Sequence, residues 1–332
     1  MKRKIYGCIL TSFAMLALIL DAKTAMVGAQ DGIELCIKVV IPSLFPFFTV
    51  SMLLCSNLQA ICPKPLKWIG GLFRMPKGAE SLLVAAILGG YPAGAQAVSQ
   101  AYQDGYLTRK QANRMLSYCN NAGPAFLFGM VALQFEDKSL VWLLWIIHIL
   151  SAVAVANILG KYDKNTLAFK SAEPLTVAAA LKRSVTIMAT VCGWIVIFRV
   201  ILLFLDRWFF FLLPVELCVF LSGLLELSNG CCQLLQVADP TLRFVLAAGM
   251  LSFGGLCISM QTASIAGSLD IEQYLKGKAL QTIISMTIAL IVVHFMDNWF
   301  IFLLGGLVMV VLVTLIRKEP AKSSSIPVEN SV

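Results

Sequence analysis

Two interruptions inside apolar sequence constrain this chain more than any other feature. They fall in residues 87–130, ILGGYPAGAQ…MLSYCNNAGPAFLFGM, where the flanking residues are typical of helix. The first break is made by Gly89, Gly90, Pro92 and Gly94, and the second by Asn120, Asn121, Gly123 and Pro124. Backbone N–H and C=O groups freed in hydrocarbon cost several kcal/mol each, so interrupted helix survives there only where protein or a water-filled cavity covers it. Transporters build substrate sites in this way, whereas kinks and loop ends at the membrane surface are the simpler interpretation.

Composition indicates a membrane protein. Of 332 residues, 59% are hydrophobic and 13% are charged, and the mean hydropathy is +0.83; a soluble domain carries about twice that share of charged residues. The net charge of +8 comes from Lys and Arg in short loops between apolar runs, which is the positive-inside pattern. We therefore expect a lipid bilayer rather than nucleic acid as the partner of these charges.

Nothing in the sequence points to enzyme chemistry. The ten cysteines form no CxxC and lie mostly inside apolar runs, which favours a packing role over metal binding or redox work. P-loop, HExxH and GxSxG motifs are absent, and there are two histidines. We expect neither a catalytic residue nor a metal or cofactor.

The first half of the chain divides at its charged loops. Residues 1–24 are predicted to form a transmembrane helix that begins inside the cell, although Val27-Gly28-Ala29 resembles a cleavage site, which leaves the fate of residues 1–29 open. A span bent at Pro42 and Pro46 follows. Next come a re-entrant hairpin near 81–103, a broken span over 116–135 and an unbroken span over 140–159. Residues 161–183 are then expected to be a cytoplasmic linker.

The second half has a similar order. It runs over residues 184–297, with a span over 184–205, a hairpin near 208–235 interrupted at Ser228-Asn229-Gly230, and a span over 242–267 broken at Ser252–Gly255. Lys276 and Lys278 are placed in an inner loop before a span over 279–296. Residues 298–316 are the last span and 317–332 a cytoplasmic tail. The total is about eight transmembrane helices and two hairpins.

The two halves also share a short motif and its spacing. MLSYCNNAG at 115–123 matches MLSFGGLCI at 250–258 in its first three letters and in an aromatic fourth. In each half a broken hairpin precedes this motif and an unbroken span follows it. The loop charges place the first hairpin entrance inside and the second outside. We therefore predict an all-α polytopic membrane protein built as an inverted-topology repeat, the plan of many secondary transporters.

Several runs of the sequence resemble the YlbJ family of sporulation integral membrane proteins, also called stage V sporulation protein V. They are GGYPAGAQAVSQAYQDGYLTRKQANRMLSYCNNAGPAFLFGMV, IPSLFPFF, GLLELSNG and LSFGGLCISMQ. This family is similar to the wider Gate, or nucleoside-recognition, group, which includes concentrative nucleoside transporters. The resemblance implies that 25–160 and 184–297 are Gate-like halves. It also implies that the protein moves dipicolinic acid across the outer forespore membrane of a spore-forming bacterium.

The candidate substrate-binding residues lie at or beside the breaks: Gly94, Gln96, Asn120, Asn121, Gly123, Glu226, Asn229, Gly230, Ser252 and Gly255. Either the two asparagines cap broken backbone or they contact the solute. The glycines permit close backbone approach, and helices that begin after them favour an anion. Glu226 is the carboxylate expected at membrane depth, either as an ion or proton site or as the partner of a cation, unless it lies in an aqueous vestibule. For His148 and Arg199, packing, pairing or snorkelling is favoured over transport.

These features predict a carrier for a small anionic solute that works by alternating access, with a coupling ion or proton. One alternative is a carrier of nucleosides or other small solutes. Another is a non-transporting membrane scaffold in spore assembly, and a third is an intramembrane enzyme, for which no nucleophile–base pair is found.

Overall fold

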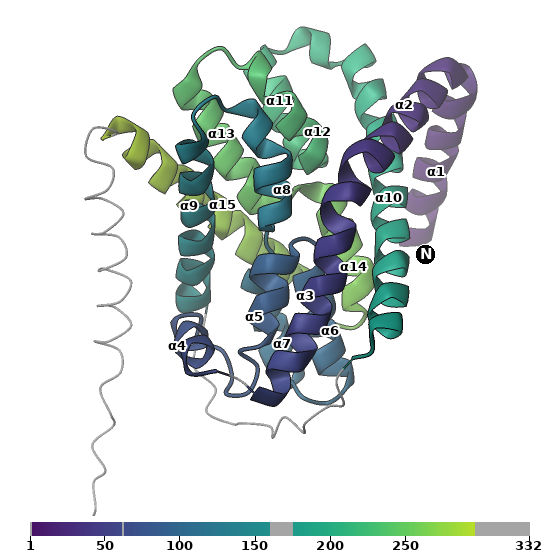
Figure 1. Ribbon diagram of the computed structural model, residues 1–332. Helices are drawn as coiled ribbons and strands as arrows, with labels where there is room; N and C mark the ends of the chain where they lie inside the picture. The colour runs from purple at the N-terminus through teal and green to yellow at the C-terminus, as the bar shows by residue number, and fades with distance from the viewer. Residues whose placement is uncertain (1, 62, 160–174, 296–332) are drawn as a thin grey trace, which may run out of the picture.

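The computed structural model describes residues 2–61, 63–159 and 175–295, and every regular element in these ranges is helical (Figure 1). Five helical stretches in them are long and apolar enough to cross a membrane: Ala22–Leu58, Lys138–Ile158, Val177–Trp208, Pro240–Ala266 and Ile271–His294. The polytopic all-helical class is therefore confirmed. The predicted last span at 298–316, the tail at 317–332 and most of the linker lie outside the described residues.

The N-terminal helices pack at one side of the molecule. Helix α1 (Lys2–Leu20) is followed at once by α2 (Ala22–Leu35), and Asp21 caps α2 by accepting a hydrogen bond from the Thr24 N–H. A π-helical turn, η1 (Cys36–Val40), joins α2 to α3 (Ile41–Ile61), and Pro46 lies inside α3. The predicted second span is therefore the end of one nearly continuous helical stretch that begins at residue 22.

The first hairpin lies at the end of the molecule that carries α4 (Lys64–Leu72) (Figure 1). It consists of α5 (Leu82–Val84), the π-helical η2 (Ala85–Gly89) and the returning α6 (Ala93–Gln103). Gly90 has a φ of 74°, a conformation that glycine adopts without the steric penalty of a Cβ. The predicted turn in GGYPAG is confirmed.

The first interrupted span begins earlier than predicted. Helix α7 (Arg109–Cys119) starts at a capping box formed by Thr108 and Gln111. The chain then leaves helical geometry at residues 120–123 and resumes as α8 (Pro124–Gly129) and the 3₁₀ turn η3 (Val131–Gln134). The break at Asn120-Asn121-Ala122-Gly123 is as predicted, and the unbroken α9 (Lys138–Ile158) follows.

The long helix α10 (Val177–Trp208) starts inside the predicted linker. Lys182 and Arg183 suggested a loop but lie in its first turns, where the side chains are exposed. Its middle packs against α2, because Gly28 and Gly32 let the helices approach closely: a Cβ on either would lie 2.9 Å from the Cα of Val200 or Val196. This is the small-xxx-small pattern of membrane helix contacts. Gly28, part of the possible cleavage site, lies within this contact.

The second hairpin lies at the opposite end of the molecule from the first (Figure 1). After the 3₁₀ turn η4 (Phe210–Leu212) it consists of α11 (Val215–Leu225), α12 (Leu227–Cys232) and the 3₁₀ turn η5 (Leu234–Gln236). The predicted interruption at Ser228-Asn229-Gly230 is wrong, because these residues are helical and the break is at Glu226. The Glu226 carboxylate caps the N-terminus of α12, so the break lies at Glu226.

The second interrupted span is divided at Gly254. Helix α13 (Pro240–Phe253) is about 21 Å long and α14 (Gly255–Ala266) about 18 Å, so the break lies near the middle of this span. Gly254 and Gly255 both have positive φ, 81° and 84°. The final described helix, α15 (Ile271–His294), packs against α7, α9 and α13.

Candidate functional site

The turn of the first hairpin meets both breaks, and the second hairpin meets the second break. A Cβ on Gly123, in the first break, would lie 2.9 Å from the Cα of Gly90 in the first turn. A Cβ on Gly254, in the second break, would lie 2.9 Å from the ring of Tyr91 in that same turn. A Cβ on Gly255 would lie 3.1 Å from the carbonyl oxygen of Gly223 in the second hairpin. The glycine pair of the second break is thus held between the two hairpins.

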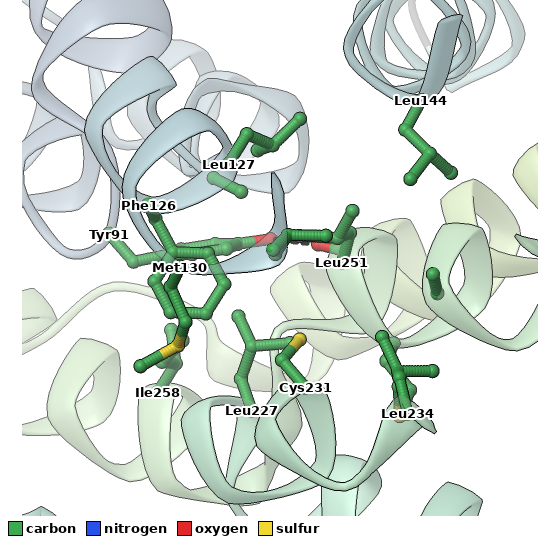
Figure 2. Close-up of a cluster of buried hydrophobic side chains, with 14 of the residues drawn as sticks. Tyr91, Phe126, Leu127, Met130, Leu144, Leu227, Cys231, Leu234, Leu251 and Ile258 are labelled. Carbon is green, nitrogen blue, oxygen red and sulfur yellow. Dashed lines mark hydrogen bonds between the residues drawn. The ribbon is translucent and has the colours of Figure 1, made fainter. Parts of the chain in front are cut away.

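One cavity of about 40 Å³ lies where these elements converge, which is room for a water molecule or two. Its lining comes from both hairpins, the first break, η1, α3, α8, α10 and α14: Val40, Leu44, Tyr91, Ala122, Gly123, Phe126, Val191, Ile195, Glu226, Leu227, Ser228, Ile258 and Gln261. Figure 2 shows Tyr91 extending toward Leu251, with Leu127 on one side of it and Leu227 and Ile258 on the other. Tyr91 of the first hairpin turn and Glu226 at the break of the second hairpin therefore line the same cavity.

Asn120 links four helices. Its side-chain Oδ1 accepts a hydrogen bond from the Ala95 N–H in the first turn of α6 at 3.4 Å. Its Nδ2 donates to the hydroxyl oxygens of Thr262 in α14 at 2.9 Å and Tyr274 in α15 at 3.3 Å. The side chain is fully buried, so capping and cross-linking of the break is the role that the geometry supplies. Contact with a solute stays a prediction.

Asn121 also stabilises the break. Its Nδ2 donates to the Tyr118 carbonyl at 2.6 Å, and its Oδ1 accepts from Gln281 Nε2 at 3.1 Å. The Tyr118 carbonyl belongs to the last turn of α7, where helical partners are missing. The amide therefore replaces a hydrogen bond that the interruption removes.

His148, in the unbroken α9, joins the two breaks. Its Nε2 accepts a hydrogen bond from the Ala122 N–H at 3.1 Å, and its Nδ1 lies 3.2 Å from the Ser252 Oγ. Since Nε2 accepts, the proton of the neutral ring is on Nδ1, which donates to Ser252. His148 therefore pairs with polar groups, as predicted. It connects Ser252 in the second break to Ala122 in the first break.

Glu226 forms the N-cap of α12 and is buried, with 2% of its surface exposed. Its carboxylate oxygens accept hydrogen bonds from the N–H groups of Ser228 at 3.0 Å and Asn229 at 2.6 Å. Arg199 donates to the Asn229 Oδ1 and forms an ion pair of 3.0 Å with Asp31 in α2. A chain of charged and polar groups therefore runs from the cavity wall, through α10, to α2.

The remaining candidates have different surroundings. Gly94 packs against the Cys119 carbonyl and Gly230 against the Gly223 backbone, so both glycines allow two backbone segments to lie in close contact. Gln96 lies apart from the central cavity and lines a second one of about 200 Å³ beside α6, with Gln100, Asp104 and Arg183 among its polar neighbours. Of the ten predicted residues, only Gly123 and Glu226 line the central cavity.

The predicted inner-loop position of Lys278 is wrong. The residue lies in α15 and is fully buried. A signal was available: Glu272 and Lys276 form an i,i+4 ion pair of 2.6 Å on the exposed face. Two residues further on, a helix has turned by about 200°, which places Lys278 on the opposite face.

Comparison with known proteins agrees with the sequence motifs. The chain is 27% identical over 293 residues to the sporulation integral membrane protein YlbJ of Bacillus subtilis (strain 168), an alignment that covers 74% of this chain and 71% of the relative. No family model and no solved structure matches. The predicted resemblance is confirmed, and the chain is similar to an integral membrane protein of sporulation.

Proposed function

We propose that this protein is a sporulation membrane carrier that moves dipicolinate, a small aromatic dicarboxylate, across the outer forespore membrane by alternating access. One observation carries the proposal: two helical hairpins from opposite ends of the molecule meet two interrupted helices around one cavity. Interrupted helices around a central site are how secondary transporters bind solutes. A scaffold or an intramembrane enzyme does not need this arrangement.

The order of elements supports an inverted-topology repeat within the Gate group. In the first half a hairpin (α5–α6), an interrupted pair (α7–α8) and a long helix (α9) follow each other. In the second half the same order recurs as α11–α12, α13–α14 and α15. The two hairpins enter from opposite ends (Figure 1), as an inverted repeat requires. We propose eight spans in all, with residues 298–316 as the last.

This sidedness has its own test. Glu136, before α9, and Lys110, in the first turn of α7, are exposed, and the proposed topology puts them on opposite sides of the membrane. Single cysteines at these positions, in a variant without the native cysteines, should react differently with a membrane-impermeant thiol reagent. Glu136→Cys is labelled from outside and Lys110→Cys only after permeabilisation; labelling of both from outside would contradict the topology.

Alternating access requires that the site open toward one side at a time. The central cavity of about 40 Å³ is too small for a dicarboxylate, whereas the cavity beside α6 holds about 200 Å³. We propose that the central cavity is closed in this conformation and that the hairpins move to open it. Glu226, on its wall, is the proposed site for a coupling cation or proton, since it is an ionisable group at membrane depth.

The dipicolinate content of spores tests the proposal. Spores from a deletion strain should contain little dipicolinate, and the wild-type gene should restore it. In the deletion strain, the Glu226→Gln variant should accumulate to the wild-type protein level but should not restore the dipicolinate content of the spores. The substitution keeps the size of the side chain and removes its charge. Glu216→Gln, in the first turn of α11 at the far end of the same hairpin, is the matched control. Normal dipicolinate in spores of the deletion strain would refute the proposal and leave the nucleoside carrier and the scaffold as alternatives.

A further inference from the structure

The strongest unassigned feature is the burial of Lys278. Lysine is almost never fully buried unless it is paired, yet this residue has none of its surface exposed. Gly277, next to it, has no room for a side chain, since a Cβ there would lie 2.6 Å from the Ser117 carbonyl oxygen. Close contact between α15 and α7 therefore holds Lys278 at the end of α7, against the first break.

Uncharged groups surround the Lys278 amine. Nζ donates hydrogen bonds to the Asn120 carbonyl at 2.9 Å and to the Gln281 Oε1 at 2.7 Å. It also lies 5.1 Å from the centre of the Tyr91 ring, whose face attracts cations. An ammonium has three donors and no acceptor, and here two oxygens and one aromatic face surround it.

No carboxylate forms an ion pair with Lys278 in the described part of the chain. Ion pairs there join other residues, among them Lys38 to Glu34, Arg199 to Asp31, Arg207 to Asp21 and Lys276 to Glu272. Ionisable residues within membrane spans are costly, and they usually pair or mark the path of a solute or ion. In the described part of the chain the Lys278 amine is therefore held by uncharged partners alone.

Tyr91 lies between Lys278 and the central cavity. Its ring contacts the amine and also lines the cavity, and it belongs to the turn of the first hairpin. If this turn withdraws, the ring leaves Lys278 and the cavity gains a positive wall. Glu226 lines the same cavity from the second hairpin, so a solute carboxylate is drawn toward α15 and away from α12.

We propose that Lys278 binds a carboxylate of the transported solute once the first hairpin opens, and that Asn120, Gln281 and Tyr91 hold the amine until then. This rests on the proposed carriage of an anionic solute. It makes Lys278 the residue that distinguishes a carboxylate from an uncharged solute of the same shape.

Binding to the purified full-length protein in lipid nanodiscs tests this. Dipicolinate is titrated against the wild type, Lys278→Met, Lys278→Arg and Lys276→Met, with the neutral pyridine-2,6-dicarboxamide as the uncharged ligand. Loss of one partner of a buried charge pair costs affinity by a factor of about thirty or more, so we expect at least that loss in Lys278→Met. Lys278→Arg keeps most of the affinity. Lys276→Met, whose side chain is exposed on the same helix, should bind as the wild type does.

A labelling experiment on the wild type covers the case in which Lys278→Met does not fold. A small amine-reactive reagent should modify Lys278 slowly, and saturating dipicolinate should block the reaction while the diamide does not. Lys276 should react in either case. Absence of Lys278 modification, or modification that dipicolinate does not change, overturns the proposal.

The outcomes separate the two proposals. Equal affinity of Lys278→Met and the wild type for dipicolinate overturns the role of Lys278 and leaves the carrier intact. Binding of picolinate, benzoate or malate, but not dipicolinate, in a way that requires Lys278 supports the residue and changes the solute. Absence of binding of all four carboxylates to the wild type overturns both.

Discussion

The hydroxyl of Tyr91 donates a hydrogen bond of 3.1 Å to the backbone carbonyl of Leu251. Leu251 lies in the last turn of α13, where the break at Gly254 leaves carbonyls without helical partners. The first hairpin therefore satisfies a backbone group that the second interrupted span exposes. This contact joins the two halves of the chain at their centre.

We expect Tyr91→Phe to destabilise the protein by about 1–3 kcal/mol, because it leaves the buried Leu251 carbonyl unpaired. Tyr118→Phe is the matched control, since the buried Tyr118 hydroxyl has no hydrogen-bond partner among the described residues. Thermal unfolding of the purified proteins in detergent measures both. An equal effect of the two substitutions would mean that the hydroxyl of Tyr91 adds nothing to stability.

The conformation of Gly254 gives a second prediction. Its φ of 81° lies in the left-handed region, and a Cβ there would meet the Tyr91 ring. Gly254→Ala should cost about 1–2 kcal/mol from the backbone alone, with a further cost from displacement of Tyr91.

Gly193 is the control for this substitution, since nothing lies within 4 Å of a Cβ at that position in α10. Gly193→Ala should stabilise the protein by about 0.5–1 kcal/mol, because alanine is the better helix residue.

In addition, Tyr91→Ala should reduce the penalty of Gly254→Ala. Additive effects of these two substitutions would show that the residues do not interact.

The tautomer of His148 is a third prediction. Because Ala122 N–H donates to Nε2, the ring should carry its proton on Nδ1. Solid-state NMR of protein labelled with ¹⁵N-histidine distinguishes the two nitrogens, and only one other histidine, His294, contributes signals. The variant His294→Gln assigns them. A protonated Nε2 would contradict the proposed link between the breaks.

The sequence predicts the breaks best where backbone chemistry alone decides them. Asn120, Gly123 and Pro124 interrupt a helix by local preference, and the break is where the sequence placed it. In the second hairpin the same reasoning chose Ser228–Gly230, but the helix begins again just after Glu226. A carboxylate that accepts two backbone N–H groups sets this break, and helix propensity does not reveal such a cap.

The partners of the breaks depend on tertiary contacts and could not be predicted. His148 and Gln281 lie in unbroken helices, and their hydrogen bonds to the first break join residues 26 and 160 positions apart. The sequence predicts a loop at Lys278 because lysine usually marks a loop in a membrane protein. Its burial follows from the contact of Gly277 with α7, which no local pattern indicates.

Uptake by proteoliposomes tests the central claim most directly. Purified wild-type protein is reconstituted, and the entry of radiolabelled dipicolinate is followed against protein-free liposomes. The carrier proposal predicts saturable uptake of the labelled dipicolinate. An excess of unlabelled dipicolinate should abolish this uptake, whereas an excess of pyridine-2,6-dicarboxamide or uridine should leave it unchanged. Uptake no faster than in protein-free liposomes, with the reconstituted protein correctly folded, would contradict it.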